Sequence, residues 1–224
     1  MIVVVASRHD REAAGLVDAW PTASLCSAED LTRPGWAWWP TGGGTSCWVV
    51  DGAIVDDEQV TGVFVRRSAV YPEEFLGTHA DDRAYMASEA HAFLVFVLSR
   101  TAATVANRSA EGFLGDEALG PERWMPAASA AGVAVSPVRA ATRPHRQRPL
   151  TLSTVQVVGD RAIGDAPAVL QRRARAVSEG LGLLWATVVF DGRHRLVDVT
   201  SARPPGAEAA EALGDLLARP RFAP

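Results

Sequence analysis

Two arginines directly follow an apolar run and could hold an anion. Residues 62–65 have the pattern of a buried parallel strand, and Arg66 and Arg67 come next. Open α/β sheets bind ligands outside the carboxyl ends of such strands. Side chains alternate along a strand, so we expect only one of the two guanidinium groups to face a cleft and grip a carboxylate or enolate. The structural alternative is a surface ion pair with Glu73 or Glu74.

The other candidates for catalysis lie in or beside a long amphipathic segment. Glu89 comes one helical turn before Phe93, on or near an apolar stripe that would disfavour its charged form and suit it to acid or base catalysis. His91, on another face of the helix, could act as a base, and Tyr71 and Tyr85 could each donate to an oxyanion. The alternatives are an ion pair between Glu89 and an arginine, and surface positions for the other three.

Three further residues could shape a substrate cleft. Asn107 and Arg108 follow a short extended segment, and Trp124 could supply an apolar wall, or simply belong to the core. The sequence shows no Ser-His-Asp arrangement, no metal-ligand spacing and no cysteine in the context of a nucleophile. The chemistry we expect is therefore proton transfer combined with stabilisation of an oxyanion.

Composition excludes several classes of protein. All 22 basic residues are arginines, against 26 aspartates and glutamates, and the net charge is −4. Charge this close to balance argues against a nucleic-acid partner. Cys26 and Cys47 have no zinc spacing. No apolar run is long enough to cross a bilayer and none resembles a secretory signal, so we expect no membrane partner and a cytoplasmic protein with reduced thiols.

The spacing of apolar residues predicts a mixed α/β protein. A buried strand over residues 2–6, a helix over 11–19 that Asp10 caps, and a short strand at 25–26 indicate a small Rossmann-like layer. The longest helix is predicted over residues 81–99.

The second half of the chain has a different pattern. A strand is predicted at residues 133–138, and two hairpins are predicted around the turns at 159–160 and 191–192. Helices at 168–179 and 208–217 accompany them, so we expect an antiparallel sheet with helices. A linker over residues 139–149 separates it from the earlier elements.

Three stretches, taken in order, resemble the ATP-grasp superfamily, particularly the ligases that modify ribosomal peptides. The first runs from the strand and basic pair at 63–68, through the helix that carries Tyr85 and Glu89, to residues 105–108. The second is the helix and strand at 124–138, and the third comprises the hairpin at 154–161 and the strand at 196–200. The resemblance implies a pre-ATP-grasp-like domain over residues 1–120 and an ATP-grasp domain over residues 121–224.

The sequence departs from this family where nucleotide and metal would bind. It has no lysine, and residues 139–150 are too few to form the family's β-layered lid. Asp198 and Thr200 stand where the family has its metal-binding Glu and Asn, with Arg203 just beyond, and Mg²⁺ tolerates such changes badly. The resemblance therefore implies a truncated fold without ATP or any other cofactor and without a metal. Asp198, Thr200 and Arg203 then either line a substrate cleft or are remnants.

These observations favour an ATP-independent enzyme of natural-product biosynthesis, of the kind expected in actinobacterial secondary metabolism. It would act as a lyase or cyclase, by dehydration and conjugate addition, on a large apolar small molecule such as a polyketide, which the seven tryptophans could accommodate. One alternative is a non-catalytic partner protein that binds a peptide or a carrier protein. A second is an ATP-dependent carboxylate-amine ligase that completes its lid as a homodimer.

Overall fold

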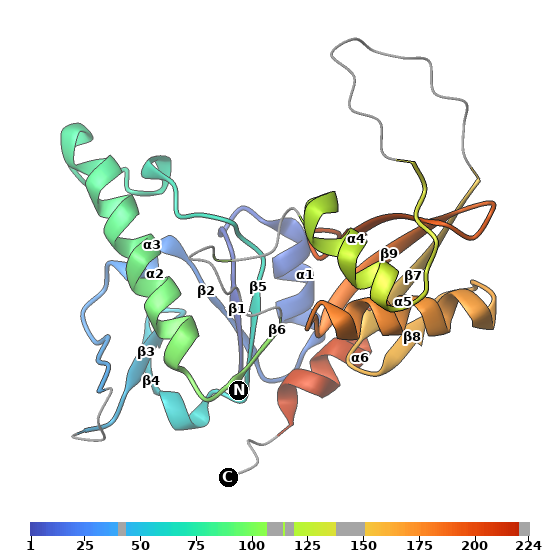
Figure 1. The fold of residues 1–224 in the computed structure, drawn as a ribbon. Helices are drawn as coiled ribbons and strands as arrows, with labels where there is room; N and C mark the ends of the chain where they lie inside the picture. The colour runs from blue at the N-terminus through green and yellow to red at the C-terminus, as the bar shows by residue number, and fades with distance from the viewer. Residues whose placement is uncertain (40–43, 107–113, 115–118, 138–150, 220–224) are drawn as a thin grey trace. The chain divides into compact units, whose positions relative to one another are not determined.

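The computed structural model describes residues 1–39, 44–106, 114, 119–137 and 151–219 of the chain (Figure 1). The chain forms two compact units. Unit 1 comprises Met1–Asp116 and Gly214–Pro224, and unit 2 comprises Glu117–Leu213. Each unit has its own sheet and its own hydrophobic core.

Unit 1 contains a parallel sheet in the order β2-β1-β5-β6. Its strands are β1 (Ile2–Val5), β2 (Ala23–Cys26), β5 (Gly62–Val65) and β6 (Thr104–Ala106). Every residue of β1 is buried, because the strand lies between two neighbours in a sheet that side chains cover on both faces. The predicted α/β class and Rossmann-like layer are confirmed.

Polar side chains cap the first two helices of unit 1 at their N-termini. Helix α1 (Arg11–Ala19) starts at Asp10, whose carboxylate accepts the backbone N–H groups of Glu12 and Ala13 at 2.9 and 3.0 Å. Such a cap contributes about 1 kcal/mol to helix stability. Helix α2 (Ala28–Leu31) begins with a capping box between Ser27 and Asp30. Both helices begin directly beyond the carboxyl end of a strand.

Aromatic side chains fill the space between a hairpin and the longest helix of unit 1. The hairpin consists of β3 (Cys47–Val50) and β4 (Ala53–Asp56), and the helix is α3 (Arg83–Arg100). Trp48 is fully buried, and Trp36 packs both on Trp48 and edge-on against Phe93 of α3. The tryptophans of this cluster pack on one another and on α3, so they contribute to the core of unit 1.

The last helix, α6 (Ala207–Ala218), begins in unit 2 and ends in unit 1. At its end, the backbone of Leu217 lies against Gly62 of β5, so closely that a Cβ atom on Gly62 would be 2.5 Å from the Leu217 carbonyl oxygen. A glycine is therefore required at the start of β5.

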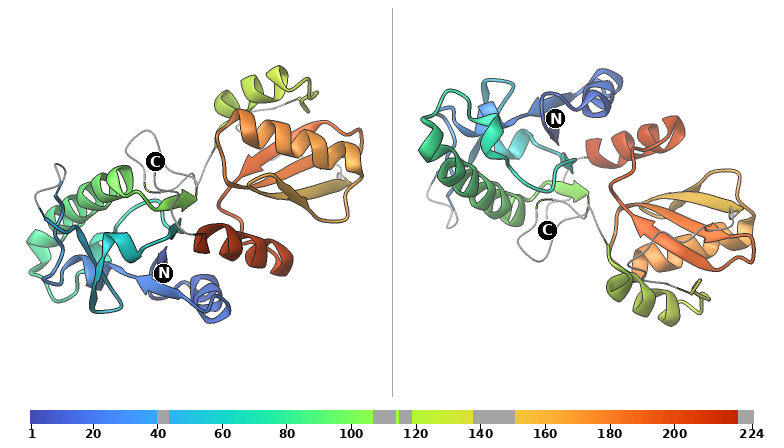
Figure 2. Two further views of the ribbon diagram at one scale, coloured as in Figure 1. Left: turned by 90° about the horizontal axis from the view of Figure 1, so that it is seen from below. Right: turned by 90° about the horizontal axis from the view of Figure 1, so that it is seen from above.

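Unit 2 contains an antiparallel sheet in the order β10-β9-β7-β8. Its strands are β7 (Leu152–Val158), β8 (Arg161–Ile163), β9 (Trp185–Asp191) and β10 (Leu196–Thr200). Helix α5 (Ala168–Gly180) lies across one face, and α4 (Pro121–Ala130) packs on α5 (Figure 2). All seven residues of β9 are buried.

The predicted strand at 133–138 is reduced to a single bridge in the described part of that segment. Val135 forms an isolated parallel bridge with Leu196, supported by hydrogen bonds from Ser136 N to Leu196 O (2.7 Å) and from Leu196 N to Ala134 O (2.8 Å). The next residue, Pro137, has no N–H group to extend the ladder.

Candidate functional site

The carboxyl edge of the parallel sheet carries a cleft of about 560 Å³. It is lined by the loop that follows β1 (residues 7–9), by residues around α2 after β2, by residues 73–78 and by Met86 of α3. This is the edge where open α/β sheets bind ligands. The cleft is therefore the candidate functional site of unit 1.

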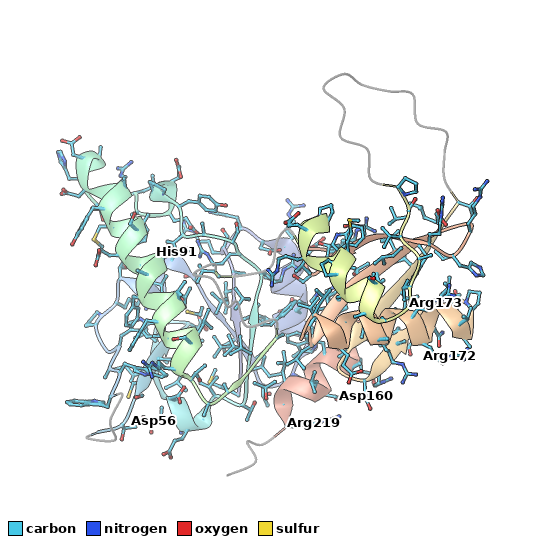
Figure 3. All side chains as sticks on the ribbon, viewed as in Figure 1. Asp56, His91, Asp160, Arg172, Arg173 and Arg219 are labelled. Carbon is cyan, nitrogen blue, oxygen red and sulfur yellow. The ribbon has the colours of Figure 1, made fainter. Side chains whose placement is uncertain are left out.

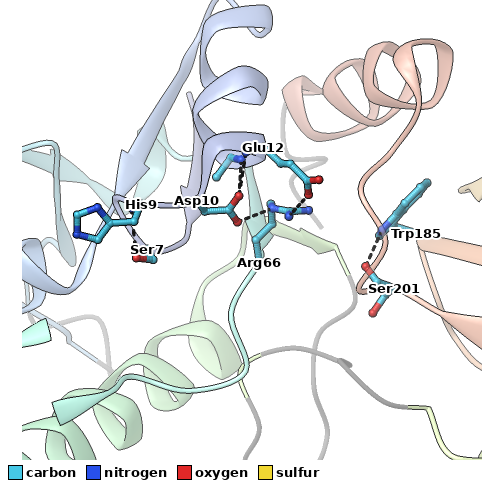
Figure 4. A network of polar contacts seen from close by, with 8 residues as sticks. Ser7, His9, Asp10, Glu12, Arg66, Trp185 and Ser201 are labelled. Atoms are coloured by element: carbon cyan, nitrogen blue, oxygen red, sulfur yellow. Dashed lines mark hydrogen bonds and ion pairs between the residues drawn. The ribbon is translucent and has the colours of Figure 1, made fainter. Parts of the chain in front are cut away.

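Arg66 joins the end of β5 to the start of α1 (Figure 4). Its Nε atom donates to Asp10 Oδ2 at 2.9 Å and its Nη2 atom to Glu12 Oε2 at 2.7 Å. Burial alone would raise the pKa of Asp10, but backbone N–H donors and Arg66 together hold this pKa below its usual value. Arg66 therefore fixes the helix start next to the strand end, and its partners are not the glutamates expected from the sequence.

Arg67 is buried and takes a different set of partners. Its Nε atom donates to Ala69 O at 2.9 Å, and its Nη2 atom forms an ion pair with Glu74, which lines the cleft. Its Nη1 atom is buried with no hydrogen-bond partner among the described residues. The alternative of a pair with Glu74 therefore applies to Arg67, and it joins a buried arginine to a partly buried glutamate of the cleft lining.

The cleft itself is lined by three residues that were not predicted from the sequence as site residues: Arg8, His9 and Glu29. Arg8, from the loop after β1, forms an ion pair with Glu29 of α2, and its Nε atom donates to His9 Nε2 at 3.3 Å. Both side chains of the Arg8–Glu29 pair are about half exposed. The signal that could have found them is the one used for Arg66: they follow buried strands at the same edge.

Asp30 ties the cleft wall to the β3–β4 hairpin. Its Oδ2 atom accepts the backbone N–H and the hydroxyl of Ser27 at 2.8 and 3.0 Å. Its Oδ1 atom accepts the backbone N–H of Gly52, in the hairpin turn, at 2.9 Å. A buried carboxylate with three donors holds α2 and the hairpin in one arrangement.

The candidates on and near α3 lie away from this cleft. Glu89 is exposed, which corrects the expectation that it borders the buried stripe, because α3 turns Ala87, Leu94, Val97 and Leu98 inward instead. Tyr85 is 67% exposed and Tyr71 is 50% exposed, with its hydroxyl 3.2 Å from Ser68 Oγ. His91 is half-buried on α3 (Figure 3). None of these four residues lines the cleft.

Three further residues were predicted to shape a substrate cleft. Asn107 and Arg108 lie outside the described residues. Trp124 is 1% exposed in the core between α4 and α5, so it is a core residue and not a cleft wall; its indole nitrogen has no partner within the described part of the chain.

The strand pair β9–β10 tests whether this chain could hold the Mg²⁺ that ATP-grasp folds imply. Asp198 pairs across the ladder with Val189, which offers no oxygen donor from its side chain. The hydroxyl of Thr200 accepts the backbone N–H of Ala202 at 3.1 Å, and Arg203 is exposed. Among the described residues, no group of three or more His, Cys, Asp or Glu side chains is placed to hold a metal ion. Mg²⁺ is usually bound by one or two carboxylates together with substrate phosphates, and β10 offers one carboxylate, Asp198, for such a role.

The buried carboxylate at the end of β9 has a structural role. Asp191 is 2% exposed and accepts the backbone N–H groups of Arg193 and Arg195 and the side chain of Arg195, all at 2.8–3.0 Å. Burial alone would raise the pKa of Asp191, but these hydrogen bonds outweigh it and hold the pKa at about 2. Asp191 thus closes the turn between β9 and β10.

Comparison with solved structures identifies the class of fold. At a TM-score of 0.72 and 11% identity, the structure resembles the macrocyclase MdnC bound with precursor peptide MdnA from Microcystis aeruginosa MRC, over 97% of this chain and 99% of that one. The structure also resembles the ATP-grasp ligase PsnB, complexed with minimal precursor, Mg and ADP, at a TM-score of 0.66 and 13% identity over 96% of each chain. No protein-family model and no curated protein matches the sequence.

A further relative extends this likeness to a third ligase. A RiPP-associated ATP-grasp ligase of Chryseobacterium gregarium, in complex with ADP and a leader and core peptide, gives a TM-score of 0.66 at 9% identity over 99% of this chain and 98% of that one. The chain therefore has an ATP-grasp-like fold, and it is related in structure to the ligases of ribosomal-peptide maturation, as its sequence predicted.

The same comparisons correct the function expected from the sequence. The similar structures are ligases bound to precursor peptides, which contradicts a lyase or cyclase that dehydrates a polyketide without ATP. They also point to a peptide as partner in place of a small apolar molecule, and they give no support for an actinobacterial setting. Within the described residues, no helix combines the length and apolar character needed to cross a membrane.

Proposed function

We propose that this protein is a non-catalytic, ATP-grasp-like partner protein that binds a peptide. The observation that carries the proposal is the pairing of Asp198 with Val189 on β10 and β9, within a fold shared with peptide-modifying ligases. Phosphoryl transfer depends on charge neutralisation by metal ions and basic residues. No group of three or more His, Cys, Asp or Glu side chains that could hold a metal ion is found among the described residues, and the chain has no lysine, which supports peptide binding more than ligation.

Unit 1 supplies the surface that we assign to the peptide. The cleft combines polar groups from Arg8, His9 and Glu73 with the apolar side chains of Leu76 and Met86. Leu76 is 68% exposed, so its side chain is accessible to a peptide that enters the cleft. A mixed cleft of this kind suits a peptide side chain flanked by main-chain polar groups.

The test combines peptide selection with an assay for ATP use. The full chain is used to select from a displayed library of random 12-residue peptides, and enriched peptides are measured by fluorescence anisotropy and then incubated with protein, ATP and Mg²⁺. We expect saturable peptide binding that Leu76→Arg weakens at least about tenfold, with no ADP formed above background. The control Asp198→Asn should bind the peptides as the parent protein does.

Two outcomes would contradict the proposal in different ways. If no enriched peptide binds, peptide recognition is wrong. If ADP forms only when peptide, ATP and Mg²⁺ are all present, and Asp198→Asn abolishes it, the protein is instead an ATP-dependent ligase. The complexes of similar folds with Mg and ADP make that second candidate worth measuring.

A further inference from the structure

Strand β4 presents an open edge in unit 1. Its partner β3 is covered on its other side: Cys47 and Ala37 exchange two backbone hydrogen bonds of 2.7 and 3.3 Å, and Asp51 N donates to Leu25 O at 3.1 Å. Strand β4 pairs with β3 alone among the described residues. An uncovered strand edge is a template on which another extended chain can pair.

The register decides which backbone groups of β4 point outward. Cys47 bonds to Ala37, and Val49 O accepts from Cys26 Sγ at 3.7 Å, so these two β3 residues point away from β4. Backbone groups alternate in an antiparallel ladder, so the residues opposite them, Asp56 and Ile54, also point away from their partner strand. The N–H and C=O of Ile54 and the N–H of Asp56 therefore face the open edge.

The side chains at this edge define the chemistry of an occupant. Ile54 is 63% exposed, although natural edge strands usually avoid exposed apolar residues. Asp51, Asp56 and Glu58 are also exposed on or next to β4. A second copy of the chain paired along this edge would place these acidic groups against one another, which is unfavourable. A segment with apolar and basic side chains complements the edge.

We propose that β4 binds an extended, basic peptide by strand addition, with main-chain hydrogen bonds to Ile54 and Asp56 and basic side chains opposite the exposed acidic residues. The inference rests on the proposed peptide-binding function and adds to the cleft a second surface, with a peptide chemistry of its own. Main-chain pairing gives the affinity in this mode, and alternate side chains give the selectivity. Asp30 accepts the backbone N–H of Gly52 in the hairpin turn and lies next to Glu29 of the cleft lining, so one residue connects the hairpin to the segment that lines the cleft.

The first test changes only the peptide. A fluorescein-labelled peptide of eight residues, alternating lysine and valine, is titrated with the full chain, beside an alternating glutamate and valine peptide. A third peptide is the lysine form with its four central amides N-methylated, which keeps the side chains but removes the donors. We expect the glutamate and N-methylated peptides to bind at least about tenfold more weakly than the lysine peptide. Equal binding of all three would overturn the proposal.

The second test changes the edge. Ile54→Pro removes an outward N–H group without breaking the β3–β4 ladder, and we expect it to lower the affinity for the lysine peptide at least about tenfold. The matched control Ile54→Ala keeps the N–H group and should lose about threefold or less. Asp56→Arg should lower the affinity for the lysine peptide and raise the affinity for the glutamate peptide. This result stays informative if Ile54→Pro does not fold.

The remaining outcomes separate this inference from the proposed function. If the display-selected peptides bind and neither Ile54→Pro nor Asp56→Arg affects any peptide, strand addition is wrong while peptide binding stands. If sedimentation shows a dimer of the free protein that Ile54→Pro dissociates, the edge belongs to a second copy and the proposal is wrong.

Discussion

The two sheets of this protein use charge in opposite ways. At the carboxyl edge of the parallel sheet in unit 1, Arg66 bridges two acidic partners and Arg8 pairs with Glu29 across neighbouring loops. In the antiparallel sheet of unit 2, β9 is buried throughout and its one carboxylate, Asp191, is held by the turn that follows it. Charge organises exposed loops around a cleft in unit 1, whereas it closes a turn in unit 2.

This difference shows that resemblance and site chemistry can point to different parts of a chain. The likeness to ATP-grasp ligases directs attention to β9 and β10, where the described residues offer few oxygen donors. The polar groups next to a cleft lie in unit 1 instead.

The largest expected effect is loss of the turn carboxylate in unit 2. Asp191→Ala leaves two backbone N–H groups and Arg195 without their acceptor, so we expect it to lower the free energy of unfolding by roughly 3 kcal/mol. Chemical denaturation followed by circular dichroism measures this. Asp160→Ala, at an exposed position in the turn between β7 and β8, is the control and should cost less than about 0.5 kcal/mol. Equal costs would mean that Asp191 is not structural.

Acid should distinguish the same carboxylate from exposed ones. The pKa of Asp191 is lowered from 3.8 to about 2 in the folded protein, so the unfolded state binds a proton first as the pH falls. Its stabilisation is therefore complete above about pH 4 and is lost between about pH 4 and 2, a change of roughly 2 kcal/mol. Denaturant midpoints of the parent and Asp191→Asn, measured from pH 5 to 2, should converge as the pH falls. A constant difference would contradict this assignment.

A smaller effect is expected at the strand end of unit 1. Arg66→Met removes the partner of Asp10 and Glu12, and we expect a loss of roughly 1 kcal/mol because the pair with Asp10 is largely shielded from water. The pKa of Asp10 should rise at the same time, because Arg66 helps to lower it. Arg8→Met, which removes an exposed pair, serves as the control and should change stability little. If both variants behave alike, the Arg66 network adds no stability.

The smallest effect concerns the thiols. Burial and the neighbouring Asp56 carboxylate, whose Oδ1 atom lies 3.5 Å from Sγ, raise the pKa of Cys47, and burial raises the pKa of Cys26. Alkylation at pH 8 followed by mass spectrometry should label Cys47 slowly and leave buried Cys26 unlabelled until the protein unfolds. Asp56→Asn should speed Cys47 labelling a few-fold. Labelling of Cys26 at the rate of Cys47 would show that unit 1 opens readily.

Local patterns carried most of the fold. Asp10 was recognisable as a helix cap because a capping side chain contacts N–H groups two and three residues on. The turn at Gly159-Asp160 was equally local, and it joins the two expected strands. The sequence did not predict that Glu89 is exposed. Apolar spacing alone does not fix which side of α3 faces the core, and the elements packed on α3 decide which of its residues are buried.

Long-range partners could not be read in the same way. Arg66 lies 56 residues from Asp10, and the sequence offered Glu73 and Glu74 as nearer candidates for it. The cleft residues Arg8, His9 and Glu29 follow the strands β1 and β2, but the sequence does not show that these two strands are neighbours. Their position beside one another depends on strands β1 and β2 pairing in parallel.

The sequence by itself determined the α/β class and the order of helices and strands, because hydrophobic period, caps and turns act over a few residues. It also showed directly that the chain has no lysine. Only the tertiary structure decided that Val189 faces Asp198, that Arg67 is buried against Glu74, and that β4 pairs with β3 alone among the described residues. Those outcomes depend on strand register and on which surfaces meet. Many pairings of the same residues are locally equivalent, and only packing of the whole chain selects among them.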